Sequence, residues 1–130
     1  MINDNYLYSA ETSKIIGCAI EVHKSLGTGF QEAIYQRALE YEFELQGLGF
    51  AREVEVPIYY KQKQIGLRRV DFLIKSKIIV ELKATSQLES VHLAQAINYL
   101  EAFNLPIGLL LNFGSTKLQF HRLNNKKHIP

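Results

Sequence analysis

The sequence contains a single cysteine, Cys18, so no intramolecular disulfide can form and nothing suggests an oxidising compartment. Cys18 lies in an apolar stretch with helical spacing, where we expect a small buried side chain rather than a nucleophile. The histidines His23, His121 and His128 do not have the spacing of metal ligands. We therefore expect neither a disulfide nor a zinc site.

Long apolar runs are also missing. No segment approaches the roughly 18 consecutive apolar residues that a membrane-spanning helix needs. The first residues, 1–8, are polar and lack the basic start and apolar centre of a signal peptide. We therefore expect a cytoplasmic protein that makes no membrane contact.

The charge of the chain is nearly balanced. A formal net charge of +2 is too small to indicate nucleic-acid binding by itself, although a locally positive surface would be enough. The chain of 130 residues has no repeat or linker and is long enough for one hydrophobic core but not for two. We expect a single domain over residues 9–123, an N-terminal tail over 1–8 and a mobile, mildly basic tail over 124–130.

Hydrophobic spacing predicts three helices and five strands. Helical spacing covers three segments, which run from a cap at Ser9 to Gly27, from 31 to 48 and from 91 to 103. The third helix has Ser86 or Ser90 as a possible cap. Strand patterns cover residues 52–60, 65–74, 78–84, 107–113 and 117–123. The run 107–113 is almost entirely apolar, which is typical of a strand that is covered on both faces.

The order of these elements predicts a mixed α/β fold. Short connections between the first three strands favour an antiparallel meander, and the helix before the fourth strand favours a right-handed crossover to a parallel strand. Covering the central strands requires helices on both faces of a mixed five-stranded sheet. Pro57 cannot donate to a strand ladder, so we expect the first strand at a sheet edge or at a bulge.

Three charged side chains interrupt the hairpin expected over residues 70–84. Glu81 and Lys83 are two residues apart on one strand and therefore point to the same face. A turn at 75–77 places Asp71 opposite Glu81, give or take one residue. Such a group costs several kcal/mol unless the charges are paired, hydrated or bound to a cation.

Two interpretations of this group remain open from the spacing alone. Asp71, Glu81 and Lys83 can form a structural ion network on a solvated sheet face. Alternatively, the two carboxylates hold Mg²⁺, with Mn²⁺ as a substitute, which neutralises a scissile phosphate and acidifies an attacking water. The lysine would then orient that water and stabilise charge on the phosphoryl oxygens.

Polar side chains on two helices are further candidates. Glu32 lies at the start of the second helix, where stabilisation by the helix dipole is a sufficient structural explanation. Gln95 and Tyr99 are one turn apart on the third helix, and His92 is a turn earlier. This polar stripe either lines a site or faces solvent.

These motifs together resemble a known family. Gly29-x-x-Glu32-x-x-Tyr35, then Asp71, Glu81-x-Lys83 and Gln95, follow the order found in the GxxExxY protein family, a branch of the PD-(D/E)XK nuclease superfamily. The resemblance extends from about Thr12 to Leu123. It implies a restriction-endonuclease-like core in which the acidic residues lie on two adjacent strands. Val70 stands where the superfamily often has a proline, a departure that it tolerates.

The resemblance also implies roles for individual residues. Asp71 and Glu81 would bind the metal, Lys83 would be the catalytic lysine, and Glu32 would add an acidic group from the preceding helix. Gln95 and Tyr99 match the Gln-x-x-x-Tyr signature of recombination-type nucleases in this superfamily, where this helix positions substrate or water. From their helical spacing, we expect Tyr35, Tyr41 and Tyr99 in the core rather than on a base-stacking surface.

We therefore expect a divalent-metal-dependent nuclease, with DNA before RNA as the substrate. Arg68 and Arg69 precede Asp71 and can contact a phosphate backbone, and Tyr99, His92 and Arg69 are the candidate substrate-binding residues. One alternative is a catalytically silent module that binds nucleic acid or a protein partner. Another is a structural domain whose acidic cluster is an ion network. A homodimer would help so small a domain hold a duplex, and we expect helices at its interface.

Overall fold

The computed structural model describes residues 7–130. Its helices are α1 (Ser9–Leu26), α2 (Glu32–Leu45) and α3 (Ser90–Phe103). Its strands are β1 (Phe50–Tyr60), β2 (Lys63–Ile74), β3 (Ile78–Lys83), β4 (Ile107–Asn112) and β5 (Gln119–Asn124). The predicted element order is confirmed, and the predicted bounds hold to within three residues. Within the described residues, no helix has the length and apolar content needed to cross a membrane.

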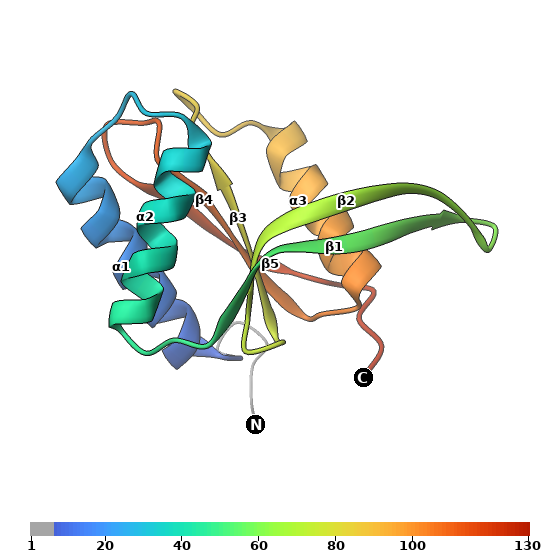
Figure 1. Ribbon diagram of the computed structural model, residues 1–130. Coiled ribbons are helices and arrows are strands. Elements are labelled where there is room, and N and C mark those ends of the chain that lie inside the picture. The colour runs from blue at the N-terminus through green and yellow to red at the C-terminus, as the bar shows by residue number, and fades with distance from the viewer. Residues whose placement is uncertain (1–6) are drawn as a thin grey trace.

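The strands form one mixed sheet in the order β1-β2-β3-β4-β5. β1, β2 and β3 are an antiparallel meander, β4 lies parallel to β3, and β5 lies antiparallel to β4. α1 and α2 cover one face of the sheet and α3 covers the other (Figure 1). β1 is an edge strand and its register shifts between Ile58 and Tyr59, as expected for a strand that contains Pro57.

Apolar side chains form one core cluster on each face of the sheet. The cluster beneath α1 and α2 includes Ile15, Cys18, Leu39, Phe72, Val80 and Leu111. The cluster beneath α3 includes Val70, Ile79, Ala96, Leu100 and Leu110. Cys18 is buried as predicted, and burial raises the pKa of its thiol, which favours the unreactive form.

The start of α1 differs from the prediction. Ser9 is the first helical residue rather than the cap, because Tyr8 occupies the cap position with a left-handed φ of 56° and no side-chain hydrogen bond. The Thr12 hydroxyl instead donates to the Ser9 carbonyl over 3.2 Å. Of the expected tail over 1–8, only Leu7 and Tyr8 are described, and both pack against the larger core cluster. Residues 1–6 lie outside the described part.

The cap of α3 is also different from the prediction. Neither Ser86 nor Ser90 caps it, because Glu89 occupies that position and forms a reciprocal capping box with His92. The Glu89 amide donates to His92 Nδ1 over 3.0 Å. His92 therefore has a structural role at the first turn of α3.

The C-terminal residues make defined contacts with the end of α3. Asn125 is buried, and its side-chain amide donates to the carbonyl oxygens of Leu100 and Leu105. The Asn104 side chain exchanges hydrogen bonds of 2.8 and 2.9 Å with the backbone of Ile129. The segment for which we predict mobility is therefore held to the body of the domain at two points.

The β1–β2 hairpin changes face near Glu53. Phe72 and Ile74 pack with α1 and α2, whereas Val70 packs with α3, although regular alternation would place all three on one face. Glu53 has a left-handed φ of 55° and lies opposite Asp71, where the ladder has no backbone pair. This local twist turns the outer half of the hairpin towards α3.

Not every tyrosine expected in the core is buried. Tyr35 is fully buried and stacks on Phe113 with 4.8 Å between ring centroids, and Tyr99 is also buried. Tyr41 is 62% exposed on the outer surface of α2, so its core assignment was wrong. The helical spacing that it shares with Tyr35 covers an arc wider than the one that α2 buries.

A buried asparagine fixes the segment that follows β3. The Asn112 side chain accepts from the Thr85 and Gly114 amides and donates to the Thr85 carbonyl and to Gln119 Oε1. Gly114 packs so closely that an added Cβ would lie 2.2 Å from the Thr85 carbonyl oxygen. This contact holds the chain that leads from Lys83 to α3.

Replacing Gly114 with alanine should destabilise the domain. The new methyl group meets backbone atoms of Thr85 rather than a flexible side chain, so we expect a loss of about 1 to 3 kcal/mol in the free energy of unfolding. Gly17→Ala is the matched control, because nothing lies within 4 Å of its added Cβ in the middle of α1. That variant should be neutral or up to about 1 kcal/mol more stable. Urea unfolding of both variants tests the contact, and equal stabilities would contradict it.

Candidate active site

Two carboxylates meet where the β2–β3 ladder stops. The last backbone pair is Phe72 with Val80, so Asp71 and Glu81 occupy the next position of the register, as predicted. Beyond this point side chains take over the interstrand contacts. The Asp71 amide donates to Glu81 Oε1 over 2.7 Å, and the Leu82 amide donates to Asp71 Oδ2 over 2.9 Å. Each strand therefore contributes a carboxylate that accepts a backbone hydrogen bond from the other.

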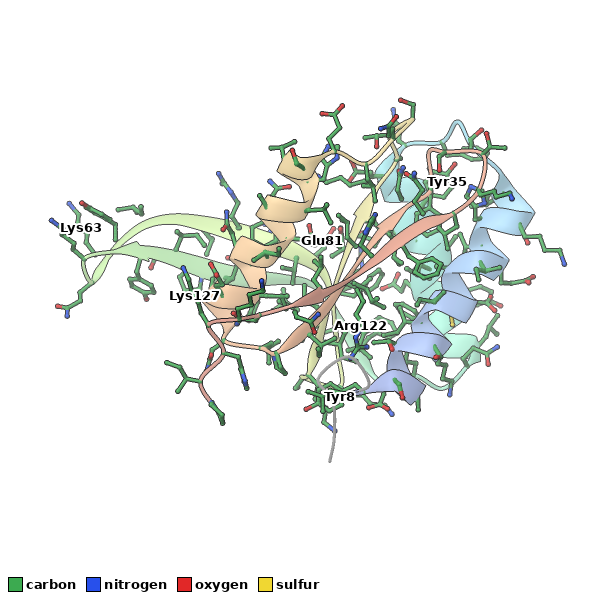
Figure 2. All side chains as sticks on the ribbon, turned by 180° about the vertical axis from the view of Figure 1, so that it is seen from behind. Tyr8, Tyr35, Lys63, Glu81, Arg122 and Lys127 are labelled. Carbon is green, nitrogen blue, oxygen red and sulfur yellow. The ribbon has the colours of Figure 1, made fainter. Side chains whose placement is uncertain are left out.

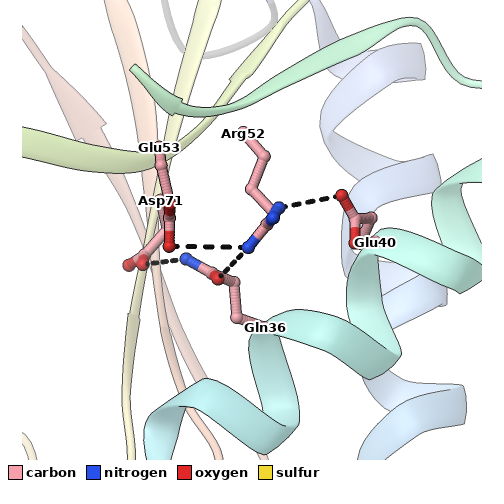
Figure 3. Close-up of polar contacts among 5 residues, drawn as sticks. All are labelled: Gln36, Glu40, Arg52, Glu53 and Asp71. Atoms are coloured by element: carbon pink, nitrogen blue, oxygen red, sulfur yellow. Dashed lines mark hydrogen bonds and ion pairs between the residues drawn. The ribbon is translucent and has the colours of Figure 1, made fainter. Parts of the chain in front are cut away.

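Residues of α2 and β1 hold the Asp71 carboxylate from the other side. Gln36 is buried on α2, and its Nε2 donates to Asp71 Oδ1 over 2.7 Å (Figure 3). Arg52 Nη1 donates to Gln36 Oε1 over 3.1 Å, which fixes the orientation of the amide. Arg52 is held in turn by Glu40 at 2.8 Å and by Glu53 at 3.4 Å. The Asp71 side chain is thus fixed by both the sheet and α2.

Burial disfavours the ionised form of both carboxylates. Burial and then the Asp71 carboxylate raise the pKa of Glu81 to about 8, against the opposing effects of the Asp71 amide and Lys83. Burial likewise raises the pKa of Asp71, although hydrogen bonds from Leu82 and Gln36 and the charge of Lys83 oppose it. Glu81 therefore holds a proton at neutral pH unless a cation takes its place.

Lys83 and Glu32 lie within the electrostatic reach of this pair. Lys83 lowers the pKa of Asp71, Glu81 and Glu32 alike, although no ion pair among the described residues includes it. Burial is the main cause of the raised pKa of Glu32, followed by the opposing charge of Lys83 and then by Asp71. Glu32 is the first residue of α2, and in Figure 1 this end of α2 lies near the C-terminal end of β3.

The motif residues around Glu32 fix the approach of α2. Gly29 has a φ of 109°, which a residue with a side chain rarely adopts. The Tyr35 hydroxyl donates to the Gly27 carbonyl over 2.6 Å and accepts from the Phe30 amide. In this motif Gly29 therefore makes the turn, Glu32 provides an acidic group, and Tyr35 anchors the loop before α2.

The candidates on α3 differ in how they relate to the carboxylates. Tyr99 is buried, and Glu81, Arg68 and Asp71 all influence the pKa of its phenol, which burial raises. His92 lies close enough to lower the pKa of Glu32. Gln95 is exposed, and no described hydrogen bond reaches it. It lies on α3 one turn from both His92 and Tyr99.

Arg68, rather than Arg69, is the arginine beside this group. Arg68 is the one whose charge acts on Tyr99. Arg69 is exposed and pairs across the hairpin with Glu55, and no ion pair among the described residues joins it to the carboxylates. Neighbouring strand residues point to opposite faces, so only one of the two can face α3.

The donor atoms fit a hard divalent cation. Among the described residues, no three His, Cys, Asp or Glu side chains converge closely enough to form a metal site by themselves. Asp71 and Glu81 do converge, and no hydrogen bond among these residues uses Glu81 Oε2. Mg²⁺ is commonly bound by one or two carboxylates and completed by waters and substrate phosphates. Two oxygen donors with a neighbouring lysine match that pattern.

Three residues that support this site were not predicted. Gln36 follows Tyr35 and lies one turn after Glu32, so a polar residue on a buried helical face was the signal that could have identified it. Arg52 carried no signal, because one arginine at the start of a strand is ordinary. Asn112 followed an apolar run, and only its burial reveals that it holds the segment after Lys83.

The raised pKa of Glu81 predicts that stability falls as pH rises. The folded protein holds a proton at Glu81 from the ordinary pKa of 4.5 up to about 8, whereas the unfolded chain has lost it. Stability from this group is therefore complete below pH 4.5 and is lost as pH rises through about 8, by at most about 1.4 kcal/mol per pH unit. Glu81→Gln should flatten the profile. Urea unfolding at several pH values, with chelator present, tests this, and parallel profiles would refute it.

Comparison with known proteins agrees with this geometry. The model of the PD-(D/E)XK nuclease superfamily matches residues 9–123. No curated protein matches the sequence. Among solved structures, the crystal structure of SSO0001 is similar to this chain with a TM-score of 0.55 and 22% identity, over 71% of this chain and 48% of that one.

The chain thus spans about half the length of SSO0001, and at this identity the similarity concerns the fold alone. The fold is restriction-endonuclease-like, with a mixed five-stranded sheet between helices. The superfamily match covers nearly all of the described residues and includes the strands that bring the two carboxylates together. The chain belongs to the PD-(D/E)XK nuclease superfamily.

Proposed function

We propose that this protein is a nuclease that depends on Mg²⁺, with Mn²⁺ as a substitute, and hydrolyses DNA phosphodiester bonds. The observation that carries the proposal is the meeting of Asp71 and Glu81 beside Lys83. Two carboxylates at one ladder position, Glu81 buried and Asp71 half-buried, destabilise the fold unless a proton or a cation compensates them. Membership of a nuclease superfamily gives a functional reason for the two carboxylates to be present.

The residues of the site would divide the work of hydrolysis. Asp71 and Glu81 would hold the cation, which when bound neutralises the scissile phosphate and acidifies a water. Gln36 and the Leu82 amide keep the Asp71 oxygens oriented. Lys83 would stabilise the negative charge that develops on the phosphoryl oxygens, and its position at the end of β3 is fixed by the Asn112 contact with Thr85.

Residues on the two helices would complete the site. Glu32 would add an acidic group that can orient a water, and Gln95 and Tyr99 would position substrate from α3. His92 would contribute to substrate binding as well as capping α3. The narrower likeness to the GxxExxY family, the cytoplasmic location and a homodimer remain predictions from the sequence.

The second candidate is a catalytically silent module with the same fold. It is favoured by one observation, which is that the described residues contain no group of three metal-ligating side chains. Such a module would bind nucleic acid or a protein partner without turnover. It would have no use for Lys83 beside the carboxylates, and this is why we prefer the nuclease.

Titration with Mg²⁺ or Mn²⁺ should show a carboxylate-dependent site. We expect calorimetry at pH 7 to detect binding that is lost in Asp71→Asn. Because Glu81 has a pKa of about 8, binding should release up to one proton, seen as a heat that depends on the ionisation enthalpy of the buffer. Glu11→Gln on α1 is the control and should bind normally. Equal binding by the Asp71 variant would leave a structural ion network as the explanation.

The nuclease proposal predicts cleavage that requires a divalent cation. Labelled DNA should be cut with Mg²⁺ or Mn²⁺ and not with chelator. Asp71→Asn and Lys83→Ala should each lose roughly 10²-fold or more in rate, as expected when a group that stabilises the transition state is removed.

Lys117→Ala removes an exposed lysine outside the site and should cut normally. All variants should retain the circular dichroism of the parent. Equal cleavage by parent, Asp71 and Lys83 variants would assign the activity to a contaminant. Binding without turnover would favour the silent module.

A further inference from the structure

The outer half of the β1–β2 hairpin, residues 54–70, projects beyond the body of the domain, and we call it the arm. In Figure 1 it extends past α3, on the side opposite to α1. α3 covers only one of its faces, through contacts with Val54 and Val70. A two-stranded ribbon with one covered face is marginally stable by itself, so its exposed side chains call for an explanation.

Large apolar and aromatic side chains are concentrated on the arm. Tyr59, Tyr60 and Ile65 are each about 60% exposed, and Leu67 is 47% exposed. The register pairs Pro57 with Leu67 and Tyr60 with Lys63. Leu67 and Arg69 face away from α3, because Arg68 and Val70 lie on the side towards it. The uncovered face is thus partly apolar and partly basic.

The positive charge of the protein is also concentrated there. The arm contains Lys61, Lys63, Arg68 and Arg69 and only one acidic residue, Glu55, so its formal charge of +3 exceeds the +2 of the whole chain. None of its four basic side chains forms an ion pair within the described residues. Lys63 extends from the tip, far from Glu81 in Figure 2. The rest of the chain carries a slight negative charge.

The arm is continuous with the candidate active site. A groove of about 680 Å³ lies between the arm and α3, and its walls include Tyr59, Arg68, Tyr99 and Lys127. Tyr99 belongs to both regions, because the charges of Glu81 and Arg68 both act on its phenol. β2 carries both Arg68 and Asp71, so a ligand that lies along the arm lies along the same strand as one of the two carboxylates.

Charge decides between a polyanion and a second copy of the chain as the ligand. A symmetric dimer through the arm would place two surfaces of charge +3 against each other, which is unfavourable. A phosphate backbone complements the same charges. A two-stranded ribbon also fits the major groove of a duplex, which is roughly 12 Å wide. From Val70 to Lys63 the arm reaches roughly 23 Å, or about seven base pairs of duplex.

We propose that the arm is a separate duplex-binding element, which holds double-stranded nucleic acid alongside the carboxylate pair through Lys61, Lys63, Arg68 and Arg69. The proposal rests on the proposed nuclease function for the identity of its ligand. It assigns affinity to the arm and chemistry to Asp71, Glu81 and Lys83. The exposed Tyr59 and Tyr60 would pack on sugar and base edges near the tip.

Fluorescence anisotropy measures the binding of a labelled duplex of about 20 base pairs. With chelator present, this measurement separates the contribution of the arm to affinity from the cleavage step. The double variant Lys61→Gln/Lys63→Gln should bind roughly tenfold more weakly or worse at about 0.1 M salt. Its slope of log affinity against log salt should fall by about 1.8, because each lost phosphate contact removes about 0.9.

Lys14→Gln/Lys24→Gln is the matched control, because it removes the same charge from exposed positions on α1. This control should keep the affinity and slope of the parent. Asp71→Asn should also bind duplex normally while failing to cleave it. If the parent protein binds duplex through the arm but never cleaves it, the nuclease function is refuted and the arm proposal still holds.

Several outcomes would overturn the arm proposal. One is equal affinity of the tip variant and the α1 control. Another is a loss seen only with single-stranded nucleic acid, which would show that the arm does not bind a duplex. A third is a parent dimer, detected by analytical ultracentrifugation, that dissociates in Ile65→Ser/Leu67→Ser while duplex affinity is unchanged. That result would identify the arm as an interface between two copies.

Discussion

The hydrogen bonds by which the Asp71 and Glu81 carboxylates join β2 to β3 determine how the rest of the site is built. Each carboxylate accepts from a backbone amide across the β2–β3 gap, so the two strands stay joined where their ladder has ended. The same bonds hold the half-buried Asp71 and the buried Glu81 together. Burial raises the pKa of both, which creates a demand for a proton or a cation.

Other elements supply what this pair lacks. α2 contributes Glu32 and also Gln36, which orients Asp71. Tyr35 anchors the loop that sets where α2 begins. Asn112 and Gly114 fix the segment after β3 and thereby the end of the strand that carries Lys83. Rigid packing behind the site keeps the two acidic groups close, because the strands cannot separate without losing core contacts.

The left-handed Glu53 links this site to the arm. Its twist places Phe72 beneath α2 and Val70 beneath α3, so one hairpin contributes to both core clusters. On the side of the twist towards the body of the domain, the hairpin provides the Asp71 carboxylate. On the other side it forms the basic, exposed arm. A backbone conformation of this kind in a residue other than glycine costs about 1 to 2 kcal/mol, and Arg52 Nη1 donates to the Glu53 carboxylate beside it.

The sequence by itself determined the element order, the sheet topology and the position of Asp71 opposite Glu81, because hydrophobic period and short turns specify strand register. The same strand spacing placed Lys83 on the face of Glu81, and the family resemblance added Glu32 as a companion of that pair. Only the tertiary structure revealed Gln36, Arg52 and Asn112, because each acts through a partner distant in sequence. It also decided that Glu89 caps α3, that Tyr41 is exposed, and that Arg68 rather than Arg69 faces Tyr99. These outcomes depend on which arc of a helix is covered and on where a strand twists, and neither is encoded in local spacing.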